Sequence, residues 1–346
     1  MRRSPAFRSI AMLAVALIVA AACGGGGGTG TAPTAAPAAS PTAVAAVQPT
    51  RATEFVIQTG PGGSSDIYAR FWISIMDKER LVPQPVQPVN KEGGAGAVAF
   101  TYVFEKRGDP HYLMVTLNSF WTTIITQRLP YKTTDFTPIV NMALDPFFLW
   151  VHADSPIRTA GDFVTAAKAK AMIASGTGAK QEDEVLFRRI QELGGTQPFT
   201  YVPQSGGGAV AAALAGKQGG VEVTVNNPSE ARSLAGQGRL RAICAFTPES
   251  PKEGTFKDLP TCKSQGLAID DYYNVRAVVG PPGMSAGAQK FWIDTFRKIN
   301  DHADWKKFLT DNALDPDFRS GDDFRKLIEQ YQKIHEEIAA KYNWVQ

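Results

Sequence analysis

The stretch GPGGSSD at residues 60–66 separates a short β-type run at residues 54–58 from a helix-type run at residues 67–76. Glycines let the backbone approach a ligand closely, and the first N–H groups of a helix have no partner within that helix. Together with the helix dipole, these N–H groups favour a carboxylate or a phosphate. Many strand-to-helix turns are glycine-rich and bind nothing, so this stretch alone leaves two interpretations open, an anion cradle and a plain turn.

A second stretch of the same kind occurs downstream. The β-type residues 200–202 lead into QSGGG at residues 204–208, which is followed by the alanine-rich residues 209–215. The second stretch therefore also combines a strand end, a glycine turn and a helix start. Two such cradles in one chain favour a two-sided clamp, in which each cradle holds part of one anionic ligand.

The N-terminus has the pattern of an export signal. Three arginines within the first eight residues precede an uncharged apolar run of 13 residues, 10–22, which is typical of a signal peptide and too short for a membrane span. We therefore expect a signal peptide over residues 1–22. The run ends in Ala-Ala-Ala-Cys, which resembles a bacterial lipobox, where the cysteine is lipidated and becomes the mature N-terminus. We predict lipidation of Cys23, and ordinary cleavage with an incidental cysteine is the alternative.

Composition separates a tether from a folded part. Residues 24–53 consist mainly of Gly, Thr, Ala and Pro, with Arg51 as their one charge, so we expect a disordered tether over residues 23–53. About 290 residues remain, more than one core usually organises, which predicts two lobes. Without the three arginines of the leader, 33 Lys and Arg balance 33 Asp and Glu, so nothing in the charge supports a nucleic-acid partner.

The cysteines also fit an exported protein. If Cys23 carries lipid, Cys244 and Cys262 remain as a pair in an oxidising compartment. We expect a disulfide between them that closes the Pro-, Lys- and Glu-rich segment 247–259, and two buried free thiols are the alternative. Neither the spacing of these cysteines nor their neighbours suggests a zinc site.

Short strand-type and helix-type runs alternate along the chain after residue 53, which predicts α/β lobes built on mostly parallel sheets. In the last helix-type run, residues 322–342, apolar residues recur at helical spacing and indicate core packing. The strand-type runs are residues 55–58, 86–89, 112–116, 147–151, 171–175, 220–225, 240–246 and 276–279.

Besides the two glycine cradles, the chain contains a series of short motifs. They are VNKEGGAG at residues 89–96, DSPI at 154–157, GTG at 176–178, GRLRA at 238–242, LPT at 259–261 and PPG at 281–283. In this order the series resembles the substrate-binding proteins of tripartite tricarboxylate transporters, also called Bug receptors, over essentially everything from Glu54 onward. Two positions depart from the family pattern, since Gln204 stands where a Lys is common and Ala179 where a Ser is common.

The resemblance implies a type II periplasmic-binding-protein fold, in which two α/β lobes close over a small organic anion. It divides the chain into lobe 1 over residues 54–150, lobe 2 over residues 151–273 and a return to lobe 1 over residues 274–346. The two cradles correspond to the family's two binding loops, one per lobe. In this family, backbone N–H groups, small hydroxyl side chains and bridging water hold a ligand carboxylate.

The candidate ligand-binding residues lie in the two cradles, as the resemblance implies, and at other strand ends. For Asp66, an N-cap of the following helix is an equal alternative. Asn226 ends a strand before a helix, a common place for ligand-facing side chains, and turn chemistry is its alternative. The candidates are Gly62, Gly63, Ser64, Ser65 and Asp66 in the first cradle, Ser205, Gly206, Gly207 and Gly208 in the second, and Ser119, Thr177, Gly178 and Asn226 elsewhere.

We therefore expect a monomeric, lipid-anchored receptor, in the periplasm or at the outer face of the cytoplasmic membrane. It would deliver a small carboxylate to the membrane permease subunits of a tripartite tricarboxylate-type transporter, without catalysis and without a cofactor. An extracytoplasmic sensor that binds the same ligand is the alternative. A hydrolytic enzyme is disfavoured, because the four histidines are scattered without metal-ligand spacing or an obvious carboxylate partner.

Overall fold

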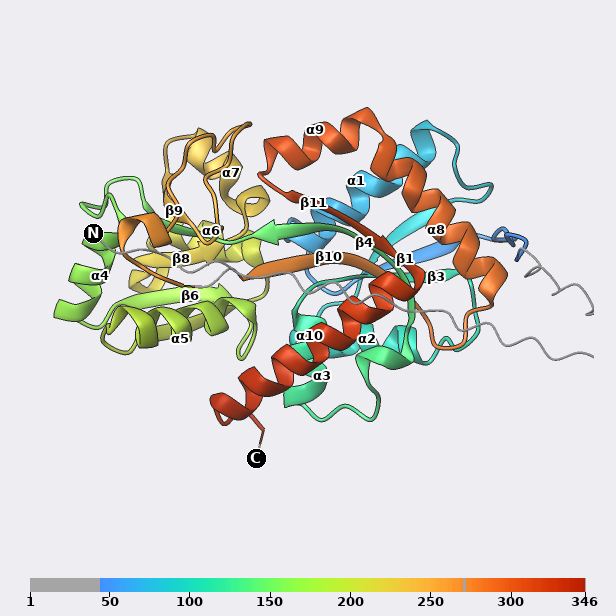
Figure 1. The fold of residues 1–346 in the computed structure, drawn as a ribbon, viewed down its shortest axis with the longest axis horizontal. Helices are drawn as coiled ribbons and strands as arrows, with labels where there is room; N and C mark the ends of the chain where they lie inside the picture. The colour runs from blue at the N-terminus through green and yellow to red at the C-terminus, as the bar shows by residue number, and fades with distance from the viewer. Residues whose placement is uncertain (1–43, 270–271, 346) are drawn as a thin grey trace, which may run out of the picture. The chain divides into compact units, whose positions relative to one another are not determined.

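The computed structural model describes residues 44–269 and 272–345. The predicted signal peptide, the predicted lipidation at Cys23 and the tether up to residue 43 lie outside the described residues. Within the described ranges, no helix is long and apolar enough to cross a membrane. From residue 44 onward the chain forms two α/β lobes, each built on one sheet (Figure 1).

Lobe 1 contains six strands in the order β11-β4-β10-β3-β1-β2. β1 pairs in parallel with β2 and β3, whereas β10 is antiparallel to β3 and β4, and β11 is antiparallel to β4. The strands are β1 (Thr53–Ile57), β2 (Val86–Asn90), β3 (Tyr112–Thr116), β4 (Thr137–Pro146), β10 (Tyr273–Gly280) and β11 (Asp315–Ser320).

Helices cover both faces of the lobe 1 sheet (Figure 1). Side chains alternate between the faces of a strand, so Phe55 and Ile57 pack in one apolar core and Val56 in the other. The first core lies under α1 (Ser64–Lys78), α8 (Ala286–Asp301) and α9 (Ala303–Asp311). The second lies under α2 (Ala97–Phe104), α3 (Ser119–Thr126) and the first half of α10 (Gly321–Lys341).

Lobe 2 contains five strands in the order β7-β6-β8-β5-β9, with β6 parallel to β7 and β8, and β5 antiparallel to β8 and β9. The strands are β5 (Phe148–His152), β6 (Ile173–Thr177), β7 (Thr200–Gln204), β8 (Val223–Asn226) and β9 (Leu240–Ala245). One face is covered by α4 (Ala160–Ala169) and α5 (Glu182–Gly194), and the other by α6 (Gly207–Ala215) and α7 (Pro228–Gly236). Short 3-10 turns occur at η1 (Gly94–Gly96), η2 (Thr133–Asp135), η3 (Gln218–Gly220) and η4 (Lys263–Gln265).

The two-lobe α/β prediction is confirmed, but both sheets are mixed rather than mostly parallel. The prediction rested on alternation of strands and helices, which indicates parallel crossovers. Two strands, β4 and β11, were not among the predicted strand-type runs. Since β4 and β11 form only antiparallel pairs, missing them removed much of the antiparallel part of the lobe 1 sheet from the prediction.

Three chain segments connect the lobes. β4 passes into β5 through Phe147, slightly before the predicted boundary at residue 150, and the chain returns to lobe 1 through β10, which lies beside β4 (Figure 1). The third connection is α10, since Leu327 packs in the core of lobe 1 and Ile338 in the core of lobe 2. The end of the predicted segment 274–346 therefore lies on lobe 2.

The last residues of the predicted tether lie against lobe 1. The Val47 N–H donates to the Gly287 carbonyl at 2.9 Å, and Arg51 forms an ion pair with Asp109 at 2.7 Å. β1 then begins at Thr53. The folded part therefore includes residues that composition alone assigned to the tether.

The predicted disulfide is confirmed, since Cys244 in β9 is bonded to Cys262, 18 residues later. Both cysteines are buried, and Ala245 forms a parallel bridge with Thr261 beside them. The bond therefore fixes the base of the segment 247–259 to the edge strand of lobe 2.

Candidate functional site

The two predicted cradles face each other across the interface between the lobes. Gly63 is the N-cap residue of α1 and Gly206 that of α6, and neither has a side chain to cap the first helical N–H groups. A Cβ added at Gly208 would lie 2.8 Å from the carbonyl oxygen of Gly62. Two helix N-termini with free backbone donors therefore come together from opposite lobes, and only glycine fits at Gly208 in this arrangement.

Asp66 holds the first cradle in shape. It lies in the first turn of α1, and its carboxylate accepts hydrogen bonds from the Gly62 N–H at 3.1 Å, from Arg70 Nε at 2.8 Å and from Asn90 Nδ2 at 3.0 Å. The side chain is buried, and these donors occupy it. The N-cap alternative is wrong because Gly63 takes that position. The contacts instead indicate a role in positioning the loop.

Hydroxyl groups of the first cradle remain available to a ligand. Ser64 and Ser65 are buried, and neither Ser65 Oγ nor Thr59 Oγ1 has a hydrogen-bond partner among the described residues. Buried hydroxyl groups are normally hydrogen-bonded. Their position beside free helix N–H groups therefore fits an anionic ligand or ordered water better than it fits a plain turn.

Asn226 positions the second cradle. Its Nδ2 donates to the Gly207 carbonyl and to Glu230 Oε2, both at 3.0 Å. A Cβ added at Gly207 would overlap the Glu230 carboxyl group and would displace it from its bonds to Asn226 and Asn227. Asn226 does not line the interlobe cavity described next. Its Nδ2 bonds support the loop from behind, and a ligand-facing role for Asn226 stays a prediction.

A cavity of about 420 Å³ lies beside the two cradles and is lined from both lobes. Among the predicted site residues, Ser119, Thr177, Gly178 and Ser205 line it, whereas the remaining candidates, all in the two cradles apart from Asn226, do not. The lining residues absent from the prediction are Gln58, Thr59, Glu92, Gly93, Gly94, Ala95, Gly96, Leu117, Ala179, Gln181 and Gln204.

The loop between β2 and α2 contributes one wall of this cavity. Its backbone is left-handed over four successive residues, with φ of 123° at Gly93, 56° at Gly94, 57° at Ala95 and 98° at Gly96. Such a run suits glycine and is costly for other residues. The cluster of glycines in the motif VNKEGGAG was therefore a usable signal for a ligand-facing loop.

Gln181 connects this loop to lobe 2. It is the N-cap residue of α5, but its side chain makes no capping bond. Instead, Gln181 Nε2 donates to the Ala95 carbonyl at 3.0 Å and to Thr123 Oγ1 at 3.3 Å, both in lobe 1. The lobes are therefore hydrogen-bonded to each other across the cavity. A sequence pattern could not have indicated this contact, because the two segments are far apart in the chain.

The turn after β6 is held firmly at the cavity wall. The Thr177 N–H donates to Asp183 Oδ2 at 2.6 Å, and the Gly178 N–H donates to the Gln204 carbonyl at 2.9 Å. The hydroxyl of Tyr201 donates to the Gly178 carbonyl at 2.9 Å. The first two bonds occupy the N–H groups of Thr177 and Gly178, so Thr177 can offer a ligand its hydroxyl but not its backbone N–H.

A buried charge network joins the lobes at the connecting strands. Arg276 in β10 and Asp145 in β4 are fully buried and form an ion pair at 2.6 Å, and Tyr68 donates to Asp145 at 2.7 Å. Arg276 Nη2 also donates to Asn227 Oδ1 at 2.8 Å, which reaches into lobe 2. Burial raises the pKa of Asp145 to about 6, although the Arg276 charge opposes this shift. Burial likewise raises the pKa of Glu182 to about 7.

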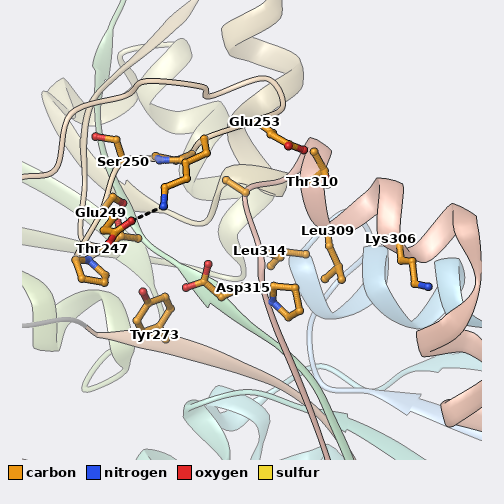
Figure 2. Close-up of a pocket in the computed structure, with 15 residues that line it drawn as sticks. Thr247, Glu249, Ser250, Glu253, Tyr273, Lys306, Leu309, Thr310, Leu314 and Asp315 are labelled. Atoms are coloured by element: carbon orange, nitrogen blue, oxygen red, sulfur yellow. Dashed lines mark hydrogen bonds and ion pairs between the residues drawn. The ribbon is translucent and has the colours of Figure 1, made fainter.

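A larger groove of about 570 Å³ lies elsewhere, between the segment 247–253 of lobe 2 and the end of α9 in lobe 1 (Figure 2). An ion pair of 2.7 Å between Lys252 and Glu249 crosses its lobe 2 side. None of the predicted site residues lines this groove. The smaller cavity beside the cradles is therefore the better candidate for the ligand site.

Two α/β lobes with mixed sheets, joined by adjacent strands and enclosing a cavity lined from both sides, define a solute-binding protein of the periplasmic type. The family model "Tripartite tricarboxylate transporter family receptor" matches residues 74–343. The chain therefore belongs to the tripartite tricarboxylate transporter receptor family, a family of solute receptors rather than enzymes.

Curated and solved relatives agree with this assignment. A Cupriavidus necator protein described as "UPF0065 protein in gbd 5'region" is 25% identical over 302 residues, which cover 85% of this chain and 88% of that protein. Rpa4515 of R. palustris, solved with adipate, has a TM-score of 0.75 at 21% identity, covering 84% of this chain and 97% of that chain. MatC of Rhodopseudomonas palustris, solved with bound malate, also has a TM-score of 0.75 at 21% identity, covering 84% and 99%.

Proposed function

We propose that this chain captures a small organic carboxylate in the 420 Å³ interlobe cavity and delivers it to the permease subunits of a tripartite tricarboxylate-type transporter. The observation that carries the proposal is the meeting of the two uncapped helix N-termini, where Gly208 faces the Gly62 carbonyl. The bound adipate and malate of the two solved relatives support the choice of a carboxylate.

The ligand contacts in this proposal divide between the lobes. The N–H groups and hydroxyls of Ser64 and Ser65, which lie beside the cavity and not in its wall, serve lobe 1, while Ser205 and the Thr177 hydroxyl in the wall serve lobe 2. A ligand held by both lobes stabilises the closed state by the difference between its affinities for the closed and the open protein. The hydrogen bonds from Gln181 to lobe 1 further stabilise the closed state.

Export and membrane attachment complete the proposal. A signal peptide over residues 1–22 and a lipid on Cys23 would place a monomeric receptor on the membrane surface. About 30 residues of Gly-, Ala- and Pro-rich chain have a root-mean-square reach of ~30 Å, enough for the receptor to approach a permease. Mass spectrometry of the membrane-extracted protein is expected to find a diacylated Cys23 at the mature N-terminus, and an unmodified residue 23 would overturn the anchor.

The binding function is tested by thermal unfolding with a panel of mono-, di- and tricarboxylates and their methyl esters. A ligand that binds only the folded protein stabilises it, by about 2.7 kcal/mol at a hundred times its Kd. We expect at least one free acid to raise the unfolding temperature while its ester does not. If no carboxylate raises it, or if esters act as well as acids, the carboxylate cradle is refuted.

A further inference from the structure

The charge of the cavity wall is negative at one position and otherwise neutral. Among the described residues that line the cavity, Glu92 is the one ionisable side chain, and the other polar groups are amides, hydroxyls and backbone. The cavity therefore has no Lys or Arg to neutralise a second anionic group on a ligand. This is unexpected for a receptor whose relatives were solved with the dicarboxylates adipate and malate.

Glu92 lies directly against the first cradle. A Cβ added at Gly60 would be 2.9 Å from Glu92 Oε2 and 3.0 Å from Oε1, so the carboxylate covers the backbone where the cradle begins. Glu92 is exposed and also lines the cavity. Its negative charge is thus close to the position at which the cradle N–H groups meet a ligand carboxylate.

The neighbouring cations are engaged elsewhere. The Lys91 ammonium lies 3.8 Å from the centre of the Tyr102 ring, and Arg70 bonds to Asp66 and Asn90. Glu92 itself forms no hydrogen bond or ion pair with any residue in the part of the chain that the structure describes. Its charge is therefore free to interact with a ligand group.

We propose that the ligand is a small zwitterion, a carboxylate that also carries an ammonium group, and that Glu92 is the specificity-determining residue that pairs with this ammonium. The inference rests on the proposed carboxylate-binding function. The cradles bind the carboxylate, and Glu92 attracts the ammonium and repels a second carboxylate. At a partly solvated site, the interaction energies of opposite and of like charges a few ångströms apart differ enough to decide which ligand binds.

The test compares matched ligands of equal length with the full chain by isothermal titration calorimetry. One series is adipate, 6-aminohexanoate and hexanoate, a second is succinate, 4-aminobutanoate and butanoate, and the common α-amino acids form a third arm. We expect an aminocarboxylate to bind at least about tenfold more tightly than its matched dicarboxylate. Glu92→Gln should lower the affinity for that aminocarboxylate about tenfold and should not lower the affinity for the matched monocarboxylate. Glu92→Lys should reverse the preference towards the dicarboxylate.

Glu105→Gln is the matched control, because Glu105 is an exposed glutamate of the same lobe that does not line the cavity. It should bind every ligand as the wild type does. The zwitterion inference fails if monocarboxylates or dicarboxylates bind but the amino group does not increase the affinity. It also fails if Glu92→Gln leaves the preference for the aminocarboxylate unchanged. In both cases the receptor function stands. If nothing in any arm binds, both the inference and the proposed function are refuted.

Discussion

Gly208→Ala should separate ligand binding from folding. The added Cβ would lie 2.8 Å from the Gly62 oxygen and 3.3 Å from the Gly62 carbonyl carbon, about 0.6 Å short of the 3.4 Å at which ordinary contact begins. Both contacts are to backbone, which cannot rotate away as a side chain can. The two cradles must therefore move apart, and the closed state loses its fit around the ligand.

The same substitution should not weaken lobe 2. Gly208 lies in the first turn of α6 with a backbone that alanine can adopt, and alanine in place of a helical glycine contributes up to about 1 kcal/mol of stability. We therefore expect an unfolding temperature equal to or above that of the wild type without ligand. The affinity for the cognate carboxylate should fall at least about tenfold, because a displacement of this size disturbs hydrogen bonds from both lobes.

The control is Gly236→Ala, at the end of α7, where an added Cβ meets no atom within 4 Å. Calorimetric titration and thermal unfolding of both variants give the comparison, and small-angle scattering with saturating ligand reports closure. We expect only Gly208→Ala to lose affinity. Wild-type affinity in a folded Gly208→Ala protein would show that the cradles do not meet around the ligand.

Three further predictions address the lobe contacts, the disulfide and a buried carboxyl. Gln181→Ala removes two bonds to lobe 1 and should lower ligand affinity about three- to tenfold, whereas Gln197→Ala, at an exposed position, should have no effect in the same titration. Cys244→Ser should reduce the free energy of unfolding by about 3 kcal/mol, since an 18-residue loop is no longer closed; an unchanged urea midpoint would contradict this. Burial raises the pKa of Glu182 from 4.5 to about 7, so its contribution to stability is fully present below pH 4.5 and is lost as the pH rises towards 7. In Glu182→Gln, the difference in free energy of unfolding between pH 5 and pH 8, measured by urea unfolding, should be smaller than in the wild type by at most about 3 kcal/mol. The same difference in both proteins would contradict this prediction.

The sequence predicted the parts of the site that depend on local structure. A strand, a glycine turn and a helix start are contiguous in the chain, so both cradles could be recognised, and the disulfide followed from an even pair of cysteines in an exported chain. Asp66 was correctly placed in the first cradle, but its bonds to Arg70 and Asn90 depend on how β2 packs beside α1.

The parts that could not be predicted depend on contacts between distant segments. In the sequence, Gln181 has the pattern of an ordinary helix-start residue, and only the packing of the two lobes against each other brings it to Ala95. From the sequence, Glu92 is predicted to be an ordinary surface charge. Only the folded loop after β2 places it against Gly60. β4 and β11 were missed for the same reason, because β4 pairs with β10 on one side and with β11 on the other, and both are far from it in sequence.

The third connection between the lobes has a consequence for ligand affinity. Two adjacent strands alone would let the lobes twist as well as bend, whereas α10, whose Leu327 packs in one lobe and Ile338 in the other, resists the twist. The open protein should therefore sample a narrow range of interlobe orientations, close to a single hinge axis. Fewer open orientations mean that less conformational entropy is lost when a ligand closes the protein. Loosening the end of α10 should thus weaken ligand binding even though no residue of that helix lines the cavity.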